Sequence, residues 1–320
     1  MRWDWPLYPR IAEAFRQAAR ELDTPITWGG VGTDAQHAVF QLLHQGTHLV
    51  PVEFVVAREP DHLLDEAHHE TLVANCIAQG AALMTGRAVF TPAYAFIPKG
   101  CFSDIVTSFL PGWTQTRLWL IARPMSGFSE TFSQYVMEVA PGGGSDAPDP
   151  DTGVEHWLFF TGGLATLTIG GMAHDLDAGG YAYIPAGSRW TLLAEGSTPA
   201  RFHWLRKIYE PAPGIPAPDH FVINERDVPV RFMPDTENRW GTTRFVDPTD
   251  TRYDMHVNIV TFQPGGVIPF EETHVMEHGL YVLEGKAVYK LNRDWVEVEA
   301  GDFMWLRAYC PQACYAAGPG

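Results

Sequence analysis

The stretch that decides the fold is GVIPFEETHVMEHGLYVLEG, residues 266–285. Glu272 and His274 are two residues apart, so on a β-strand both side chains point to the same face. His278 follows closely, and one carboxylate with two imidazoles is a donor set that suits a divalent metal ion. Gln312, in a later apolar segment, is taken as the fourth ligand. The sequence therefore predicts a metal site made by Glu272, His274, His278 and Gln312.

The spacing of these residues resembles that of the cupin family. The first cupin motif reads Gly, five residues, His-x-His, three or four residues, Glu, six residues, Gly. Residues 266–285 fit this frame with the first His and the Glu exchanged. The second motif places a His eleven residues after a Gly, a position that Gln312 occupies relative to Gly301. The exchanged ligands are similar to those of the ureidoglycine aminohydrolase branch of two-domain cupins.

The cupin pattern occurs twice, about 120 residues apart, which indicates tandem barrels rather than a solenoid. A proline-rich stretch, residues 210–219, lies between the two copies and reads as a linker. We expect a mainly β fold of two cupin (double-stranded β-helix, or jelly-roll) barrels that follow a small α-rich fragment. The expected ranges are residues 1–86 for the fragment, 87–209 for the first barrel and 219–320 for the second, metal-binding barrel.

The first barrel is expected to be metal-free. Counting back from Gly163, the motif's ligand positions fall on Pro150, Thr152 and His156, and the fourth falls on Trp190. Only His156 could bind a metal, and one imidazole does not hold a divalent ion. We interpret His156 as a structural histidine in a pocket filled by aromatic side chains. His174, His203 and His256 lie outside any ligand spacing and are expected to be packed or exposed.

The N-terminal stretch resembles an interior segment of glucose-6-phosphate isomerase. The matching residues are GTDAQHAVFQLLHQGT (32–47) and HHETLVANCIAQ (68–79). The resemblance implies a Glu base at the position that Gly30 occupies, and the family's phosphate-binding loops have no counterpart here. We therefore expect no isomerase activity from this fragment.

The cupin resemblance implies a reaction: hydrolysis of (S)-ureidoglycine to (S)-ureidoglycolate and ammonia in allantoin (purine) breakdown. It implies Mn²⁺, or another divalent metal, as cofactor and a small-molecule substrate. Tyr289 stands where the family has a substrate-contacting tyrosine, although a core aromatic is the alternative; the catalytic residues stay unassigned. The family has a further strand after the second motif. The chain ends at Gly320 before it, so we expect a truncated second barrel with slow turnover.

Two other function classes stay open at this point. One is a cupin oxygenase or isomerase, and the other is a non-catalytic cupin that binds a small molecule. Cys310 and Cys314 could be read as metal ligands, but two buried thiols are the favoured interpretation. The structural alternative for the Glu-x-His pair is a set of polar residues on an exposed edge strand.

Composition limits the partners. The net charge of -16 argues against nucleic acid or an anionic membrane as a partner. No stretch approaches the roughly 20 apolar residues of a membrane span, and 4 cysteines are too few for a disulfide framework. We expect a cytoplasmic protein that forms a homo-oligomer of undetermined size.

Overall fold

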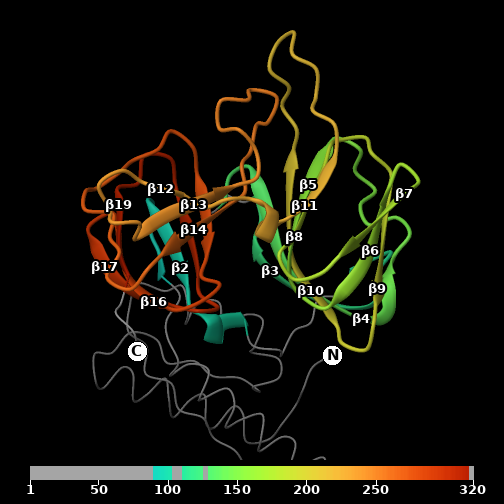
Figure 1. The fold of residues 1–320 in the computed structure, drawn as a ribbon, viewed down its shortest axis with the longest axis horizontal. Helices are drawn as coiled ribbons and strands as arrows, with labels where there is room; N and C mark the ends of the chain where they lie inside the picture. Colours follow the sequence, from blue (N-terminus) through green and yellow to red (C-terminus); the bar gives the residue numbers. More distant parts are fainter. Residues whose placement is uncertain (1–88, 103–109, 125–128, 317–320) are drawn as a thin grey trace, which may run out of the picture. The chain divides into compact units, whose positions relative to one another are not determined.

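The computed structural model describes residues 89–102, 110–124 and 129–316 (Figure 1). This described part is almost entirely β; its two short 3₁₀ helices are η1 (Lys99–Phe102) and η2 (Glu225–Asp227). Within the described ranges, no helix has the length and apolar character needed to cross a membrane. The expected α-rich fragment, residues 1–86, lies outside the described residues.

One large antiparallel sheet forms the first half of the described chain. Its strand order is β11-β8-β5-β10-β4-β9-β6-β7, and β3 pairs with β4 off this path. The bounds are β3 (Thr114–Ala122), β4 (Phe132–Ser145), β5 (Val154–Gly162), β6 (Leu164–Ile169), β7 (Met172–Leu176), β8 (Gly180–Ile184), β9 (Trp190–Glu195), β10 (Ala200–Ile208) and β11 (Phe221–Asn224).

Three smaller sheets form the second half, in the orders β1-β2-β18-β15, β12-β13-β14 and β17-β16-β19. Figure 1 shows these strands grouped apart from the first sheet, with β2 among them despite its place early in the chain. The bounds are β1 (Val89–Phe90), β2 (Tyr94–Ile97), β12 (Arg231–Phe232), β13 (Trp240–Arg244), β14 (Asn258–Phe262), β15 (His278–Tyr281), β16 (Lys286–Leu291), β17 (Asp294–Glu299), β18 (Phe303–Leu306) and β19 (Gln312–Ala316).

The two halves exchange strands. β2, from the range assigned to the first barrel, pairs with β18, so that Ile97 lies opposite Phe303. β11, from the range assigned to the second barrel, pairs with β8, so that Phe221 lies opposite Tyr183. The large sheet and the sheet β1-β2-β18-β15 therefore each contain a strand that the sequence order assigns to the other half. Neither half can lose its partner without exposing a strand edge.

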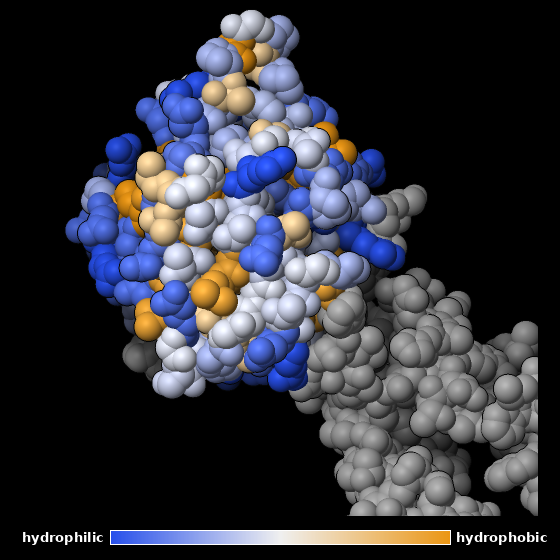
Figure 2. Space-filling view, turned by 90° about the vertical axis from the view of Figure 1, so that its right-hand side faces the viewer, coloured by the Kyte–Doolittle hydropathy of each residue, from blue (hydrophilic) through white to orange (hydrophobic). Residues whose placement is uncertain are grey.

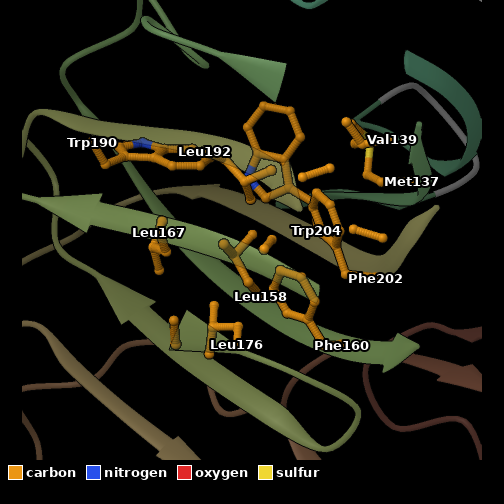
Figure 3. Packing of buried hydrophobic residues seen from close by; sticks show 14 of the residues in the cluster. Met137, Val139, Leu158, Phe160, Leu167, Leu176, Trp190, Leu192, Phe202 and Trp204 are labelled. Atoms are coloured by element: carbon orange, nitrogen blue, oxygen red, sulfur yellow. The ribbon is translucent and has the colours of Figure 1, made fainter. Parts of the chain in front are cut away.

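Aromatic and aliphatic side chains fill the space against the first sheet (Figure 3). Trp204 contacts Trp113 and Trp190 at ring-centroid distances of 5.5 and 5.7 Å, and Phe160 stacks on Phe202 at 4.8 Å. Truncating one such buried ring costs roughly 3–5 kcal/mol of folding free energy. The interior of the first barrel is therefore a packed core, as expected from the aromatic residues near His156.

Two sequence patterns of the second half do not become the elements that they resemble. Residues 254–262 alternate as a strand does, but β14 begins only at Asn258. The residues before β14 bind to the first sheet instead. The Val257 carbonyl accepts a hydrogen bond from the Tyr181 hydroxyl (2.9 Å), and Asp254 binds Lys207 (2.5 Å). Gly285, directly before β16, has φ +77°, as in a tight turn between paired strands. The flanking strands β15 and β16 nevertheless lie in different sheets, so this turn does not close a hairpin.

Large apolar side chains remain exposed on the first sheet, among them Leu164, Met172 and Leu193. Figure 2 shows one face of the molecule, on which apolar residues lie between polar ones. Scattered apolar residues of this kind are normal for a folded protein surface.

Candidate metal centre

The backbone joins the two segments that carry the expected ligands. The Glu272 N–H donates to the Gln312 carbonyl at 3.0 Å, and the Gln312 N–H donates to the Glu272 carbonyl at 3.0 Å. Residues paired in this way across two antiparallel segments present their side chains to the same face. Gln312 opens β19 and is buried, whereas the Glu272 side chain is 22% exposed. The fold thus places the carboxylate beside the amide.

The two histidines continue from Glu272 toward β15. His274 Nε2 lies 3.6 Å from Glu272 Oε1, and the ring centroids of His274 and His278 are 4.8 Å apart. His278 is the first residue of β15, where it pairs with Leu306. The Tyr309 N–H donates to the His274 carbonyl at 2.6 Å and holds the loop between the two histidines. Glu272, His274 and His278 are thus neighbouring side chains, and Gln312 lies opposite Glu272 through the backbone bridge.

The expectation that Glu272 and His274 share a regular strand is wrong. Glu272 makes an isolated bridge, and His274 lies in a loop. The ladder stops because the Cys310 N–H, the next donor along, bonds to the Arg307 carbonyl at 3.0 Å. This turn also forces Tyr309 to φ +64°, in the left-handed region. His274 is therefore positioned by a turn and not by the alternation of a strand.

His278 is held neutral at neutral pH. Burial, followed by the adjacent His274, lowers the pKa of His278 to about 4. Removal from water disfavours the charged imidazolium, and a second imidazole nearby adds repulsion. A neutral ring keeps a nitrogen lone pair available, which is the form in which histidine binds metals.

These residues suit a divalent ion in chemistry and in backbone position. Carboxylate and amide oxygens with imidazole nitrogens are ligands for Mn²⁺ and similar ions. Within the described ranges, no three His, Cys, Asp or Glu side chains already converge closely enough to hold an ion. The His274 side chain is 37% exposed and has room to turn. Binding would therefore need side-chain rotation on a backbone that already joins the two motifs.

Tyr289 lies on the strand that pairs with the one Gln312 opens. It is part of β16, lies opposite Cys314 of β19, and packs with Trp240 and Ile268. Burial raises the pKa of Tyr289 well above its ordinary value, and the neighbouring Cys314 thiol and Glu272 carboxylate raise it further. Its hydroxyl therefore stays protonated and can donate a hydrogen bond.

The cysteines near the site are buried and free. Cys310 and Cys314 are 5% and 0% exposed and form no disulfide. Burial raises the pKa of the Cys314 thiol to about 12, so it is not a thiolate at neutral pH. Metal ligation by cysteine needs the thiolate, so both residues act as small core side chains.

His156 in the first barrel is surrounded by aromatic rings. Trp204 Nε1 donates to His156 Nδ1 at 3.4 Å, and the Trp190 ring centroid lies 5.2 Å from the imidazole. Burial, and then the charge of Arg206, lowers the pKa of His156 to about 3. Asp149 accepts from Arg206 at 2.5 Å. His156 is thus an uncharged, hydrogen-bonded core residue.

The remaining histidines pack against other groups. His203 is buried, with its ring 4.4 Å from Tyr281 and its Nδ1 3.4 Å from the amide of Gln134. His174 lies edge-on to His220, with ring centroids 5.9 Å apart.

Two surface cavities of about 340 and 300 Å³ lie elsewhere. The larger is lined by Thr131, Arg206 and Lys207, and the smaller by Trp119 and Tyr281, among others.

One residue beside the candidate centre that the sequence analysis did not single out is Glu277, whose carboxylate accepts four hydrogen bonds. Its only signal was its position directly before His278.

Three protein families match parts of the chain. The cupin domain matches residues 258–320, the EutQ-like cupin domain matches residues 126–209, and phosphoglucose isomerase matches residues 14–92. The described β architecture is thus a cupin-type fold with two cupin domains.

Individual relatives agree with this division. The (S)-ureidoglycine aminohydrolase of Escherichia coli is 30% identical over 216 residues, which are 68% of this chain and 81% of the relative. A solved structure from Pseudomonas aeruginosa, described as a glyoxylate-induced protein, is 62% identical with a TM-score of 0.70; the match covers 73% of this chain and 87% of that one. The glucose-6-phosphate isomerase of Sphingopyxis alaskensis is 86% identical over 72 residues, which are 22% of this chain but only 14% of that enzyme.

Proposed function

The chain belongs to the (S)-ureidoglycine aminohydrolase family, and we propose that it catalyses the reaction which that name denotes. Water would replace the amine of (S)-ureidoglycine by a hydroxyl, giving (S)-ureidoglycolate and ammonia. The reaction is assigned to the second cupin domain, residues 219–320, because that domain carries the full donor set. The first domain, residues 87–209, has a packed aromatic interior and is assigned a structural role.

The observation that carries the proposal is the mutual backbone bridge between Glu272 and Gln312. These residues are 40 positions apart in the sequence and come from the two separate motifs. A bridge between them supports a common site, whereas polar residues scattered on an exposed edge would have no reason to meet.

Glu272, His274, His278 and Gln312 would hold Mn²⁺ or a similar divalent ion. When bound, such an ion supplies a positive template that fixes a small polar substrate and its handedness. The protein supplies the rest of the recognition. The Tyr289 hydroxyl, which stays protonated, is proposed to donate a hydrogen bond to the carboxylate or ureido oxygen of the substrate in place of its hydrogen bond to the Cys314 side chain.

The test measures metal content and ammonia release on the same preparations. We expect the chain loaded with Mn²⁺ to release ammonia from ureidoglycine. His274→Ala and Gln312→Ala should each lower bound metal and the rate by at least about tenfold, since even second-shell changes cost that much in other metal sites. His256→Ala, outside the ligand spacing, is the control and should change neither.

Other outcomes identify the other function classes. Oxygen consumption with Fe(II) in the absence of ammonia release would indicate an oxygenase. Binding of ureidoglycine without turnover would indicate a binding protein. Full metal content in both alanine variants would contradict the proposed site. The isomerase-like stretch takes no part in this reaction scheme.

A further inference from the structure

Glu277 has the most fully engaged carboxylate among the residues around the candidate centre. Its Oε1 accepts from the Thr131 N–H (2.6 Å) and the Thr131 hydroxyl (2.5 Å). Its Oε2 accepts from the Glu130 N–H (2.7 Å) and from Trp305 Nε1 (2.7 Å). Hydrogen bonds to an ionised carboxylate are roughly twice as strong as neutral ones. Four of them on one side chain fix its position.

These bonds connect three elements at the beginning of β15. Glu130 and Thr131 precede β4 of the first cupin domain, and Trp305 belongs to β18 of the second. Glu277 directly precedes His278, the first residue of β15. One carboxylate thus joins both domains to the residue before an expected metal ligand.

The residues next to Glu277 also pack tightly against the first domain. A Cβ atom at Gly279 would lie 2.7 Å from the Phe132 ring and 3.1 Å from Gln134 Oε1. Gly279 is paired with Trp305 across the β15–β18 ladder. An ion pair between Arg307 and Glu130 (3.2 Å) adds a further link between the same segments. The start of β15 therefore rests directly on the first domain.

We propose that Glu277 is a positioning residue that holds His278 in place for metal binding by anchoring the start of β15 to the first domain. The proposal rests on the proposed function, because it takes His278 as a ligand. Glu277 is not itself a ligand in this scheme, since both its oxygens are already engaged by donors. It gives the first domain, which lacks the donor set, a role in the site of the second.

Glu277→Gln tests this with little change of shape. The amide keeps one acceptor oxygen but turns an N–H₂ group toward two of the four donors. We expect amide hydrogen exchange in residues 278–281 to accelerate at least tenfold, and the Kd for Mn²⁺ alone to rise about 10- to 100-fold. Thr131→Val removes one of the four bonds from the opposite side. It should shift both quantities in the same direction but less.

Glu138→Gln is the matched control. Glu138 also accepts from two side chains, Arg117 (3.3 Å) and Arg201 (2.9 Å), but only within the first domain. The Glu138→Gln variant should leave amide exchange in residues 278–281 and the Kd for Mn²⁺ unchanged. A double variant, Glu277→Gln with Thr131→Val, should raise the exchange rate and the Kd for Mn²⁺ only slightly more than Glu277→Gln alone. The two effects overlap because the two residues share hydrogen bonds.

The outcomes separate the proposals. Unchanged exchange in residues 278–281 of Glu277→Gln would overturn the anchoring role, whether or not the protein binds Mn²⁺. Faster exchange with an unchanged Kd would overturn the positioning role. Failure of the unsubstituted protein to bind Mn²⁺ would overturn the proposed function, and with it His278 as a ligand, while the exchange data would still report on the anchor.

Discussion

At the scale of single residues, glycines in the left-handed region are the most sharply constrained positions. Gly163 lies between β5 and β6 with φ +75°, and a Cβ there would lie 2.2 Å from the Pro199 carbonyl oxygen. Gly170 has φ +57°, but a Cβ there would meet nothing within 4 Å. The two positions share a similar backbone conformation and differ in the space around them.

We predict that Gly163→Ala lowers the free energy of unfolding by about 3 kcal/mol or more, because a backbone clash adds to the left-handed strain. Gly170→Ala should cost about 1 kcal/mol, from the backbone conformation alone. Urea unfolding of both variants measures the difference. Equal losses would show that the Pro199 contact does not limit this turn.

At the scale of elements, one aspartate holds the second cupin motif to the exchanged N-terminal segment. Asp302 is 4% exposed and directly precedes β18. Its Oδ1 accepts from the Lys99 N–H at the start of η1, and its Oδ2 accepts from the Glu299 N–H at the end of β17, both at 2.8 Å. Two elements from opposite ends of the described chain thus depend on one carboxylate.

We predict that Asp302→Ala destabilises the protein by about 2 to 4 kcal/mol, because two backbone donors lose their partner in a buried place. Asp302→Asn keeps one acceptor oxygen and should lose about half as much. Thermal unfolding gives the comparison. Asp247→Ala is the control, because Asp247 makes two similar bonds to Thr249 at an exposed site and should change little. A large loss at Asp247 would argue against burial as the cause.

At the scale of the whole molecule, a buried carboxyl group and three histidines with lowered pKa values set the pH dependence of stability. Burial, and then the charge of Asp254, raises the pKa of Glu155 to about 8. Burial lowers the pKa of His156 to about 3 and the pKa values of His203 and His278 to about 4. Trp157 and Tyr183 donate to Glu155 at 3.2 and 3.0 Å and hold it in place.

The signs of these shifts predict a stability maximum near pH 6.5. Below about pH 6.5 the unfolded chain binds protons at His156, His203 and His278 that the folded chain does not bind, so stability rises with pH up to that point. Between about pH 4.5 and 8 the folded chain keeps a proton on Glu155 that the unfolded chain has lost, which lowers stability as pH rises. From about pH 4.5 to 6.5 the three histidines outweigh Glu155, and above about pH 6.5 only the Glu155 effect remains.

From pH 6.5 to 8 we therefore predict a fall in the free energy of unfolding of roughly 2 kcal/mol. Urea unfolding across this range measures the fall. Glu155→Gln cannot ionise and should flatten the curve above pH 6.5 while leaving the rise at lower pH. If the free energy of unfolding of Glu155→Gln still falls between pH 6.5 and 8, another group causes the fall.

The spacing of residues within the two motifs predicted much of the candidate site. The intervals between Glu272, His274, His278 and Gln312 marked two segments that the structure joins through the backbone bridge of Glu272 and Gln312. The tandem motifs predicted two cupin domains. The regular strand expected for Glu272 and His274 failed because a turn elsewhere, at residues 307–310, took the donor that the strand needed. The spacing of Glu272 and His274 holds no information about the turn at residues 307–310, about 35 residues away, whose carbonyl binds the Cys310 N–H.

The sequence alone determined the cupin fold class, because motif spacing is a local property, and residue type at the motif positions supplied the proposed ligands. Only the tertiary structure decided the exchange of β2 and β11 between the halves, and the four bonds that make Glu277 an anchor. Those features arise from pairings between segments about 40 to 210 residues apart. The hydrogen-bond partner of a strand edge or a carboxylate is chosen by what the folded chain brings within reach, and not by the residues next to it in sequence.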